Sequence, residues 1–181
     1  MNMDNQSDGR KPFADLAELE ATLREMALRP SDEFGLTELE HGAQCAEALA
    51  LARPDDLELQ IAGLIHDIRQ GPVHDKVGAD AVRGVLGERV ATLVGLHVDA
   101  KRYLVSTDRC YQGQLSGVSL RTLKLQGEVM SEAEIVRFEA NPYASDALVL
   151  RRADDSAKVV GKTIAGLEAW LPALREVAKR R

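Results

Sequence analysis

The sequence predicts an all-α protein, a bundle of amphipathic helices. Aromatic residues make up only 4% of the chain, whereas alanine, leucine, valine, glutamate and arginine are abundant, a composition typical of helical proteins. Apolar residues recur at helical spacing through most of the chain. No stretch has the pattern of a sheet. These observations together give the fold class, and the start and stop signals of the individual helices support it.

The length of the chain indicates a single domain. A chain of 181 residues buries a substantial core without disulfides or structural zinc, so Cys45 and Cys110 need no structural role and should stay reduced in a cytoplasmic protein. We expect one domain over residues 13–181, preceded by a loose or disordered polar arm over residues 1–12. No signal peptide is visible, and no apolar run approaches the roughly 20 residues that cross a bilayer.

The charge of the protein favours a small ligand. The formal net charge is −6, which argues against a nucleic-acid partner. The absence of a long apolar run likewise argues against a membrane partner.

The first part of the chain predicts two helices with clear boundaries. Apolar residues keep helical spacing from Phe13 until Pro30 stops the pattern. Thr37 and Glu40 then form a capping box at the start of the second helix. That helix breaks before Pro54.

A third helix is expected over residues 57–68, with Asp55 and Asp56 as candidates for its N-cap. Its last turn would hold His66 and Asp67, which lie side by side in an apolar run. A buried ionised carboxylate must be paired or bound to a cation. This pair is therefore the first indication of a metal site.

The middle of the chain predicts two more helices and a loop. A turn at residues 71–72 precedes a short helix that Gly87 closes. The helix that follows places His97 and Lys101 on one face, one turn apart. Residues 108–127 are richer in glycine, serine and threonine, and we expect a partly irregular connection there.

Three further helices complete the predicted bundle. A capping box at Ser131 opens the first, which ends at residues 141–142. The second begins near Ser145, and the last, an amphipathic helix, begins near Thr163.

The histidines indicate what the bundle binds. The chain has only four histidines, all between residues 41 and 97: His41, His66, His74 and His97. Any one of these histidines, taken alone, is as easily a surface residue or a hydrogen-bonded core residue as a metal ligand. For the four together, a purely structural role is less favoured, because three of them lie on or beside apolar helical faces. With Asp67 and a later aspartate they form a complete ligand set for two metal ions, in which the carboxylate of Asp67 would bridge ions about 3.5–4 Å apart.

The ligand residues follow the pattern H…HD…D, with two further histidines before the last aspartate. The accompanying motifs are Leu39-Glu40-His41-x-x-Gln44, His97-Val98-x-Ala100-Lys101-Arg102-Tyr103-Leu104, Leu125-Gln126-Gly127 and Leu150-Arg151-Arg152-x-Asp154-Asp155. Over residues 37–158 this combination resembles the HD-domain superfamily. Within it, the chain is most similar to the phosphonate-degrading mixed-valent di-iron oxygenases, which are related to myo-inositol oxygenase.

The resemblance implies an HD-domain helical bundle with a dinuclear site in its core. Spacing from Arg151 leaves Asp154 and Asp155 open as the last ligand, and the register of the family selects Asp154. The implied metal ligands are His41, His66, Asp67, His74, His97 and Asp154. The implied cofactor is a mixed-valent Fe(II)/Fe(III) pair, with manganese, zinc or magnesium as the alternative.

The resemblance also implies an anion site. The family holds the phosphonate of its substrate with a lysine, a serine and an arginine, which correspond to Lys101, Ser119 and Arg151. Charge-assisted hydrogen bonds from such groups would fix a doubly charged oxyanion while the metals face the adjacent carbon. Asp67, as the bridge, and Lys101 are the expected catalytic residues.

Three positions depart from the family pattern. Ser31 and Phe34 stand where the characterised oxygenases have a tyrosine and a glutamate, and Gln70 replaces a histidine used at the substrate. We expect Phe34 and Gln70 to line the substrate pocket and to change its specificity. A shift of one residue in the loop would instead place Glu33 where the family has its glutamate.

Three functions are consistent with these residues. The first is a di-iron oxygenase that uses O2 to hydroxylate a small organophosphonate or cleave its C–P bond. The second is an HD phosphohydrolase, in which a metal-bound hydroxide attacks a phosphate ester or nucleotide. The third is a metal-dependent ligand-binding protein without turnover. The two extra histidines and the anion set favour the oxygenase.

Overall fold

The computed structural model describes residues 11–181, and this part of the chain is helical with no strand. The prediction of an all-α fold is confirmed. The helices are α1 (Leu16–Met26), α2 (Glu38–Ala52), α3 (Leu57–Ile65), α4 (His74–Leu86), α5 (Glu88–Thr107), α6 (Gly117–Leu125), α7 (Glu132–Glu139), α8 (Ala144–Ser156) and α9 (Leu167–Lys179), with a 3₁₀ helix, η1, at Tyr111–Gln114. Most of the expected arm, residues 1–12, lies outside the described residues.

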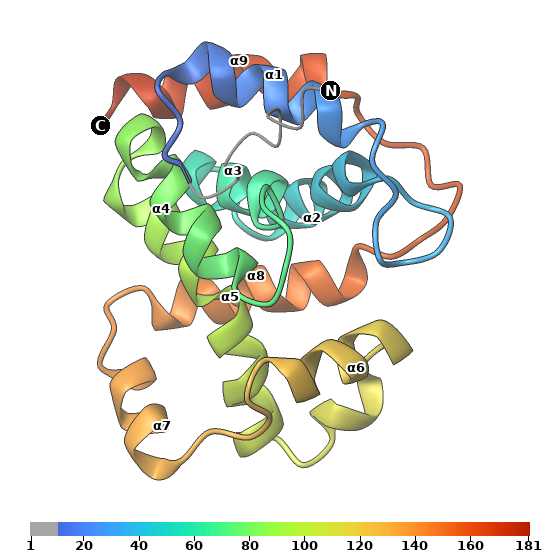
Figure 1. Ribbon diagram of the computed structural model, residues 1–181, viewed down its shortest axis with the longest axis vertical. Coiled ribbons are helices and arrows are strands. Elements are labelled where there is room, and N and C mark those ends of the chain that lie inside the picture. The colour runs from blue at the N-terminus through green and yellow to red at the C-terminus, as the bar shows by residue number, and fades with distance from the viewer. Residues whose placement is uncertain (1–10) are drawn as a thin grey trace, which may run out of the picture.

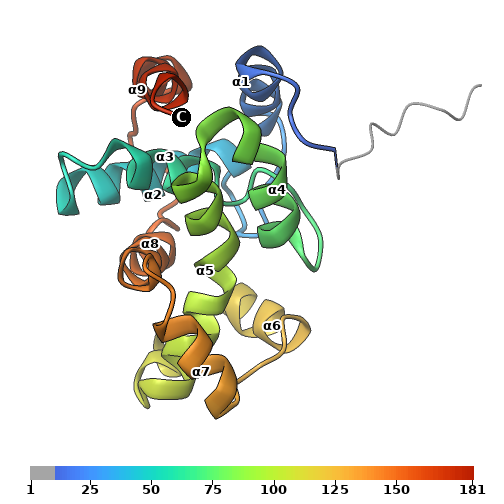
Figure 2. The same ribbon diagram turned by 90° about the vertical axis from the view of Figure 1, so that its left-hand side faces the viewer.

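Helices α2, α3, α4, α5 and α8 form the body of the molecule. The closest packing is between α4 and α5, α2 and α3, and α5 and α8 (Figure 1). Helices α1 and α9 lie side by side across one end of this body. At the opposite end, α6 and α7 flank the second half of α5 (Figure 2). None of the helices in the described part is both long and apolar enough to span a membrane.

The backbones of α2 and α3 approach each other closely at Gly42 and Leu64. A Cβ atom added to Gly42 would lie 2.2 Å from the carbonyl oxygen of Leu64, which is far inside van der Waals contact. The side chains around this contact are fully buried leucines and isoleucines such as Leu49 and Ile65. This packing brings His41, on α2, close to His66, which directly follows α3.

The predicted helix starts agree with the structure at three places. The hydroxyl of Thr37 accepts from the amide of Glu40 at 3.2 Å, and the Glu40 carboxylate accepts from the amide of Thr37 at 2.7 Å. The second capping box, at Ser131, is also present. Asp56 caps α3 by accepting from the amide of Leu59. These caps satisfy amides that a helix start leaves unpaired.

The prediction that His66 and Asp67 lie in the last turn of the third helix is wrong. The helix ends at Ile65, so both residues lie in the turn that follows. Nδ1 of His66 bonds the carbonyl oxygen of Gly63 at 2.8 Å, one of the carbonyls that a helix end leaves without an amide partner.

Residues 108–127 are more regular than predicted. They contain η1 and α6, and Ser116 caps α6 by accepting from the amide of Ser119. One other boundary also differs from the prediction. The last helix starts at Leu167 rather than near Thr163.

Candidate metal centre and anion pocket

Six side chains that are distant in sequence converge inside the helical body, and they are the six that the sequence predicts as ligands. They come from α2, the turn after α3, the first residue of α4, the middle of α5 and the end of α8. They form two groups whose ligand atoms lie within 4.8 Å of one another. The groups are His41, His66 and Asp154, and Asp67, His74 and His97.

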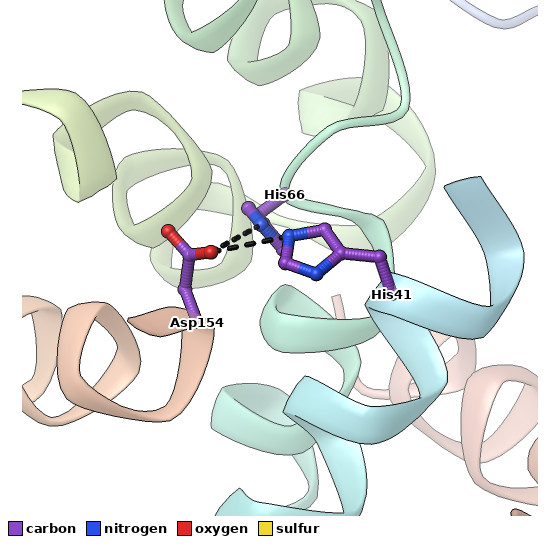
Figure 3. A group of neighbouring side chains, drawn as sticks. All are labelled: His41, His66 and Asp154. Atoms are coloured by element: carbon purple, nitrogen blue, oxygen red, sulfur yellow. Dashed lines mark ion pairs between the residues drawn. The ribbon is translucent and has the colours of Figure 1, made fainter. Parts of the chain in front are cut away.

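The first group lies between α2, α3 and α8, and its three side chains point toward one another (Figure 3). Nε2 of His41 is 3.1 Å from Oδ1 of Asp154, and Nε2 of His66 is 3.6 Å from the same oxygen. Donor atoms that share one ion at about 2.1 Å lie about 3 Å apart at a right angle. The separations therefore suit donors around a single cation.

Asp67 connects the two groups. Its Oδ2 lies 3.6 Å from Nε2 of His41 and 3.3 Å from Nε2 of His66. Its Oδ1 lies 3.1 Å from Nε2 of His74 and 3.6 Å from Nε2 of His97. One carboxylate thus presents one oxygen to each group, which is the arrangement that a bridging carboxylate requires.

Backbone carbonyls orient all four imidazoles in the same way. Nδ1 lies 2.8 Å from Ala157 O in His41, 2.8 Å from Gly63 O in His66, 3.0 Å from Gly71 O in His74 and 2.7 Å from Val94 O in His97. A carbonyl only accepts, so each Nδ1 carries the hydrogen. The lone pair of each neutral ring is then on Nε2, the atom that faces the other ligands.

The lone pairs of these rings need a cation. Nε2 of His74 and Nε2 of His97 are 3.0 Å apart, and two lone pairs at this distance repel each other unless a positive charge lies between them. Nε2 of His66 is fully buried and has no hydrogen-bond partner among the described residues. Imidazole nitrogens with carboxylate oxygens are donors that iron, manganese and zinc accept, so the residues fit a pair of such ions.

The charges of the cluster shift its pKa values in opposite directions. Burial alone would raise the pKa of Asp154, but the Arg151 guanidinium and His66 hold it well below its usual range. Burial would lower the pKa of His66, yet Asp67 and Asp154 raise it well above its usual value. The pKa of His97 is lowered by burial and by His74 and His66. The carboxylates are therefore ionised, as metal ligands must be.

A cavity of about 430 Å³ opens onto both ligand groups. It is lined by the three residues predicted to bind an anion, Lys101, Ser119 and Arg151. Lys101 is only 3% exposed, and its Nζ donates to Oγ1 of Thr122 at 3.0 Å. Across the described chain, no carboxylate lies within ion-pair distance of this ammonium group. Burial and the charge of Arg151 lower its pKa to about 8.

Arg151 joins the cavity to the first ligand group. Its Nη1 lies 2.6 Å from Oδ2 of Asp154, and its Nη2 lies 3.5 Å from the hydroxyl of Ser119. Nη2 also pairs with Asp155, and Nε donates to the hydroxyl of Tyr111 at 3.0 Å. Asp154 therefore faces the histidines while Asp155 faces away from them and fixes Arg151.

Comparisons with known proteins decide the family. The chain is 37% identical to a hydroxymethylphosphonate dioxygenase of Gimesia maris, over 75% of this chain and 74% of that protein. It belongs to the family of the phosphonate dioxygenases. It is also 31% identical to an uncharacterised protein of Acanthamoeba polyphaga mimivirus, over 74% of this chain and 68% of that one.

A further relative within the phosphonate dioxygenases is a 1-hydroxy-2-(trimethylamino)ethylphosphonate dioxygenase (glycine-betaine-forming) of Leisingera caerulea. The identity is 30%, over 56% of this chain and 59% of that protein. No family model matches the chain.

The sequence predicted that two residues of this chain line the substrate pocket, and the structure places only one of them there. Phe34 is 96% exposed and does not line the cavity, so the expectation that it lines the substrate pocket is wrong. The loop that carries it turns Glu33 toward the cavity instead, where its Oε1 accepts from the hydroxyl of Ser116 at 2.7 Å. Gln70 lines the cavity, and its Nε2 donates to Oε1 of Glu38 at 3.1 Å.

Sequence reasoning missed two charged residues of the cavity. Lys158 follows the end of α8, and its Nζ reaches the hydroxyl of Ser119 at 2.8 Å and Oε1 of Glu33 at 3.0 Å. Its position seven residues after Arg151 was an available signal. Glu38 precedes His41 by one helical step on α2, which was the signal for its place in the cavity. Burial and the charge of Asp67 raise the pKa of Glu38.

Proposed function

We propose that this protein is an O2-dependent, di-iron oxygenase of the HD-domain type that acts on a small organophosphonate. The observation that carries the proposal is the unpaired ammonium of Lys101, buried in the same cavity as the two ligand groups. A buried cation without a counter-ion favours an anionic ligand. The named relatives that act on phosphonates support phosphonate as that anion.

The ligand residues divide between two iron ions. His41, His66 and Asp154 would hold one, His74 and His97 would hold the other, and Asp67 would bridge them. When bound there as an Fe(II)/Fe(III) pair, the ions supply the activation of O2.

The cavity residues bind and orient the substrate. Lys101, Arg151 and the hydroxyl of Ser119 would donate to the phosphonate oxygens, and charge-assisted bonds of this kind are short and directional. Arg151 already contacts Asp154 of the first ligand group, so an anion bound to Arg151 lies next to that group. The carbon attached to phosphorus would then face the ligand cluster, and holding the reacting groups together lowers the barrier.

The reaction that this orientation allows breaks a C–H bond and the C–P bond. With hydroxymethylphosphonate, one molecule of substrate and one of O2 would give formate and dihydrogen phosphate. The carbon is oxidised and O2 accepts all four electrons, so no further reductant is needed.

The experiment that tests this proposal is metal analysis of anaerobically purified protein, followed by incubation with hydroxymethylphosphonate. We expect two irons per chain, a mixed-valent EPR signal, and equal consumption of O2 and release of phosphate. The Lys101→Ala variant should keep its iron and lose affinity for the substrate. Zinc, manganese or magnesium in the site, with hydrolysis of a phosphate ester in the absence of O2, would overturn the proposal in favour of a phosphohydrolase.

A further inference from the structure

The two ligand groups are held differently. All three side chains of the first group are at most 6% exposed. In the second group, Asp67 lies in the turn between α3 and α4, residues 66–73, and His74 directly follows that turn. The side chains of Asp67 and His74 are 29% and 14% exposed. The geometry of the second group therefore depends on what holds this turn in place.

Inside the turn, the carbonyl of Gly71 orients His74. It accepts from Nδ1 of the His74 ring at 3.0 Å and from the amide of the same residue at 3.2 Å. Gly71 has a φ of +105°, and glycine has a wider range of backbone conformations than any other residue. A glycine fixes the direction of its own carbonyl poorly, so contacts of the neighbouring residues have to fix it.

Arg69 makes such contacts. Its Cζ lies 4.3 Å from the centre of the Phe13 ring, and its Nη2 donates to the carbonyl oxygen of Lys11 at 3.0 Å. A guanidinium within about 6 Å of the centre of an aromatic face makes a favourable cation–π contact. No carboxylate of the described chain lies within ion-pair distance of this guanidinium. The contacts with residues 11–13 are therefore its main attachments.

Residues 11–13 are themselves fixed to the helix that carries His74. The Phe13 side chain is 4% exposed, and its amide donates to the carbonyl oxygen of Ala81, on α4, at 2.9 Å. The backbone before α1 thus runs beside α4 (Figure 2). Residues 11–13 therefore connect the turn, through Arg69, to α4, so that both partners of the contact that orients His74 are held.

We propose that Arg69 is a positioning residue for the metal ion of the second ligand group. Through its contacts it holds the turn in the conformation that directs Nε2 of His74 toward Asp67 and His97, at 3.1 and 3.0 Å. This inference rests on the proposed function for the presence of two metal ions. It adds a residue outside the ligand set that controls how tightly one of the ions is bound.

Dialysis of the protein without O2, against buffers of graded free Fe(II) concentration, tests the inference. Iron per chain should rise in two steps, and the His74→Ala variant, which lacks a ligand of the second group, assigns the step that belongs to that group. Arg69→Met keeps an unbranched side chain but removes the charge and the donors.

In Arg69→Met, we expect half-loading of the second group to need about three- to tenfold more free Fe(II) than in the wild-type protein. Half-loading of the first group should change by less than about twofold. The effect is smaller than the loss of about 10–100-fold that is typical for residues in contact with a metal ligand, because Arg69 acts through Gly71.

Two variants separate positioning from a general loss of stability. Arg69→Lys keeps a cation that can lie over the Phe13 ring, and it should restore most of the affinity. Arg175→Met is the matched control, because Arg175 pairs with Glu20 at 2.8 and 3.0 Å and connects α9 to α1, two helices that carry no ligand. It should load both groups like the wild-type protein, even where thermal unfolding shows a similar loss of stability.

A double variant tests whether Arg69 acts through His74. In His74→Ala the side chain that Arg69 positions is gone, so adding Arg69→Met should change the remaining iron loading by less than about twofold. Effects of two residues that act through one contact are not additive.

Several results would overturn the inference. They are a second group that Arg69→Met loads as tightly as the wild-type protein, an equal weakening of both groups, failure of Arg69→Lys to restore the affinity, and a further loss in the double variant. The same selective loss in Arg175→Met would also overturn it.

Loading and turnover separate this inference from the proposed function. If the wild-type protein loads two ions and Arg69→Met weakens one of them, but no phosphonate is oxidised, the oxygenase proposal fails and the positioning role stands. If hydroxymethylphosphonate is oxidised and Arg69→Met binds both ions normally, the oxygenase proposal stands and the positioning role is wrong. A wild-type protein that never loads a second ion overturns both.

Discussion

Arg151 donates from Nε to the hydroxyl of Tyr111 at 3.0 Å, and both side chains are buried. The same guanidinium contacts Asp154 of the candidate metal centre and Asp155, which also bonds the Tyr111 hydroxyl. Tyr111 and Asp155 lie on the side of Arg151 that faces away from the histidines. They therefore position a cation that contacts both the ligand cluster and the anion cavity.

Replacing Tyr111 with phenylalanine should weaken phosphonate binding without removing metal. The ring would still pack, but Arg151 would lose a hydrogen bond, and bonds to charged groups contribute about 1.5–3 kcal/mol. Because Asp154 and Asp155 still hold the guanidinium, we expect a rise in KM of about three- to tenfold with a smaller change in kcat. Steady-state kinetics and metal analysis check this outcome.

Tyr103→Phe is the matched control for this variant. Its hydroxyl bonds Glu139 at 2.8 Å on the surface, outside the cavity. The positioning role of Tyr111 is wrong if both variants have the same KM as the wild-type protein, or if Tyr111→Phe lowers kcat and metal content together.

Asp67→Asn should reduce the metal content to one ion or none. The carboxylate of Asp67 faces nitrogens of four histidines and so connects the two ligand groups. The amide of asparagine keeps the shape of the side chain, but its nitrogen cannot bind a cation, so this connection is lost. Asp99→Asn, at an aspartate paired with Lys76 outside the cavity, is the control and should retain both ions. Elemental analysis of both proteins measures the number of metal ions per chain, and full metal retention in Asp67→Asn would exclude a bridging role.

The affinity for a phosphonate should fall above pH 8. The pKa of Lys101 is lowered to about 8 by burial and by the charge of Arg151, so its protonated form, which binds the anion, predominates only below that pH. Above it, affinity should decrease by up to about tenfold per pH unit, as expected for the loss of one proton.

Lys101→Arg provides the comparison for this pH dependence. Arginine stays charged throughout the accessible pH range, so the ratio of the dissociation constants of the two proteins removes the titration of the ligand itself. A ratio that stays constant from pH 6 to 10 would show that Lys101 is not the titrating group.

Gly42→Ala should strongly destabilise the protein. The new Cβ would lie 2.2 Å from the carbonyl oxygen of Leu64, so α2 and α3 would have to separate. We expect a loss of about 2–4 kcal/mol in the free energy of unfolding, in the range of overpacked core substitutions. Gly84→Ala is the control: it lies in α4 with no atom within 4 Å of the added Cβ, and it should stabilise by up to about 1 kcal/mol. Thermal or urea unfolding of both variants measures the difference.

Several local features of the fold follow from short sequence signals. The capping boxes at Thr37 and Ser131 and the end of α4 at Gly87 depend on residues within one turn of one another, and local hydrogen bonds decide them. The end of α3 was misjudged because the apolar run continues through Ile68. The helix α6 was missed because it is short and its first residue is a glycine, Gly117, where local helix propensity is weak.

The cavity was predicted less completely than the ligand cluster. Lys158 and Glu38 carry no distinctive pattern by themselves, and their importance depends on which side chains face them across the cavity. The exposure of Phe34 depends on how one loop turns between α1 and α2, and a shift of one residue in a loop reverses which side chain faces inward.

The sequence by itself determined the helical fold class and five of the six side chains that come together, the four histidines and Asp67, whereas the choice of Asp154 over Asp155 came from the resemblance to the HD-domain superfamily. It could do so because helical periodicity and the scarcity of histidine are visible without coordinates. Only the tertiary structure decided which oxygen of Asp67 faces which group, that Lys158 neutralises Glu33, and that Lys101 and Glu38 keep unpaired charges. These features depend on distances between helices far apart in the chain, and charge pairing in a buried site changes over a few ångströms.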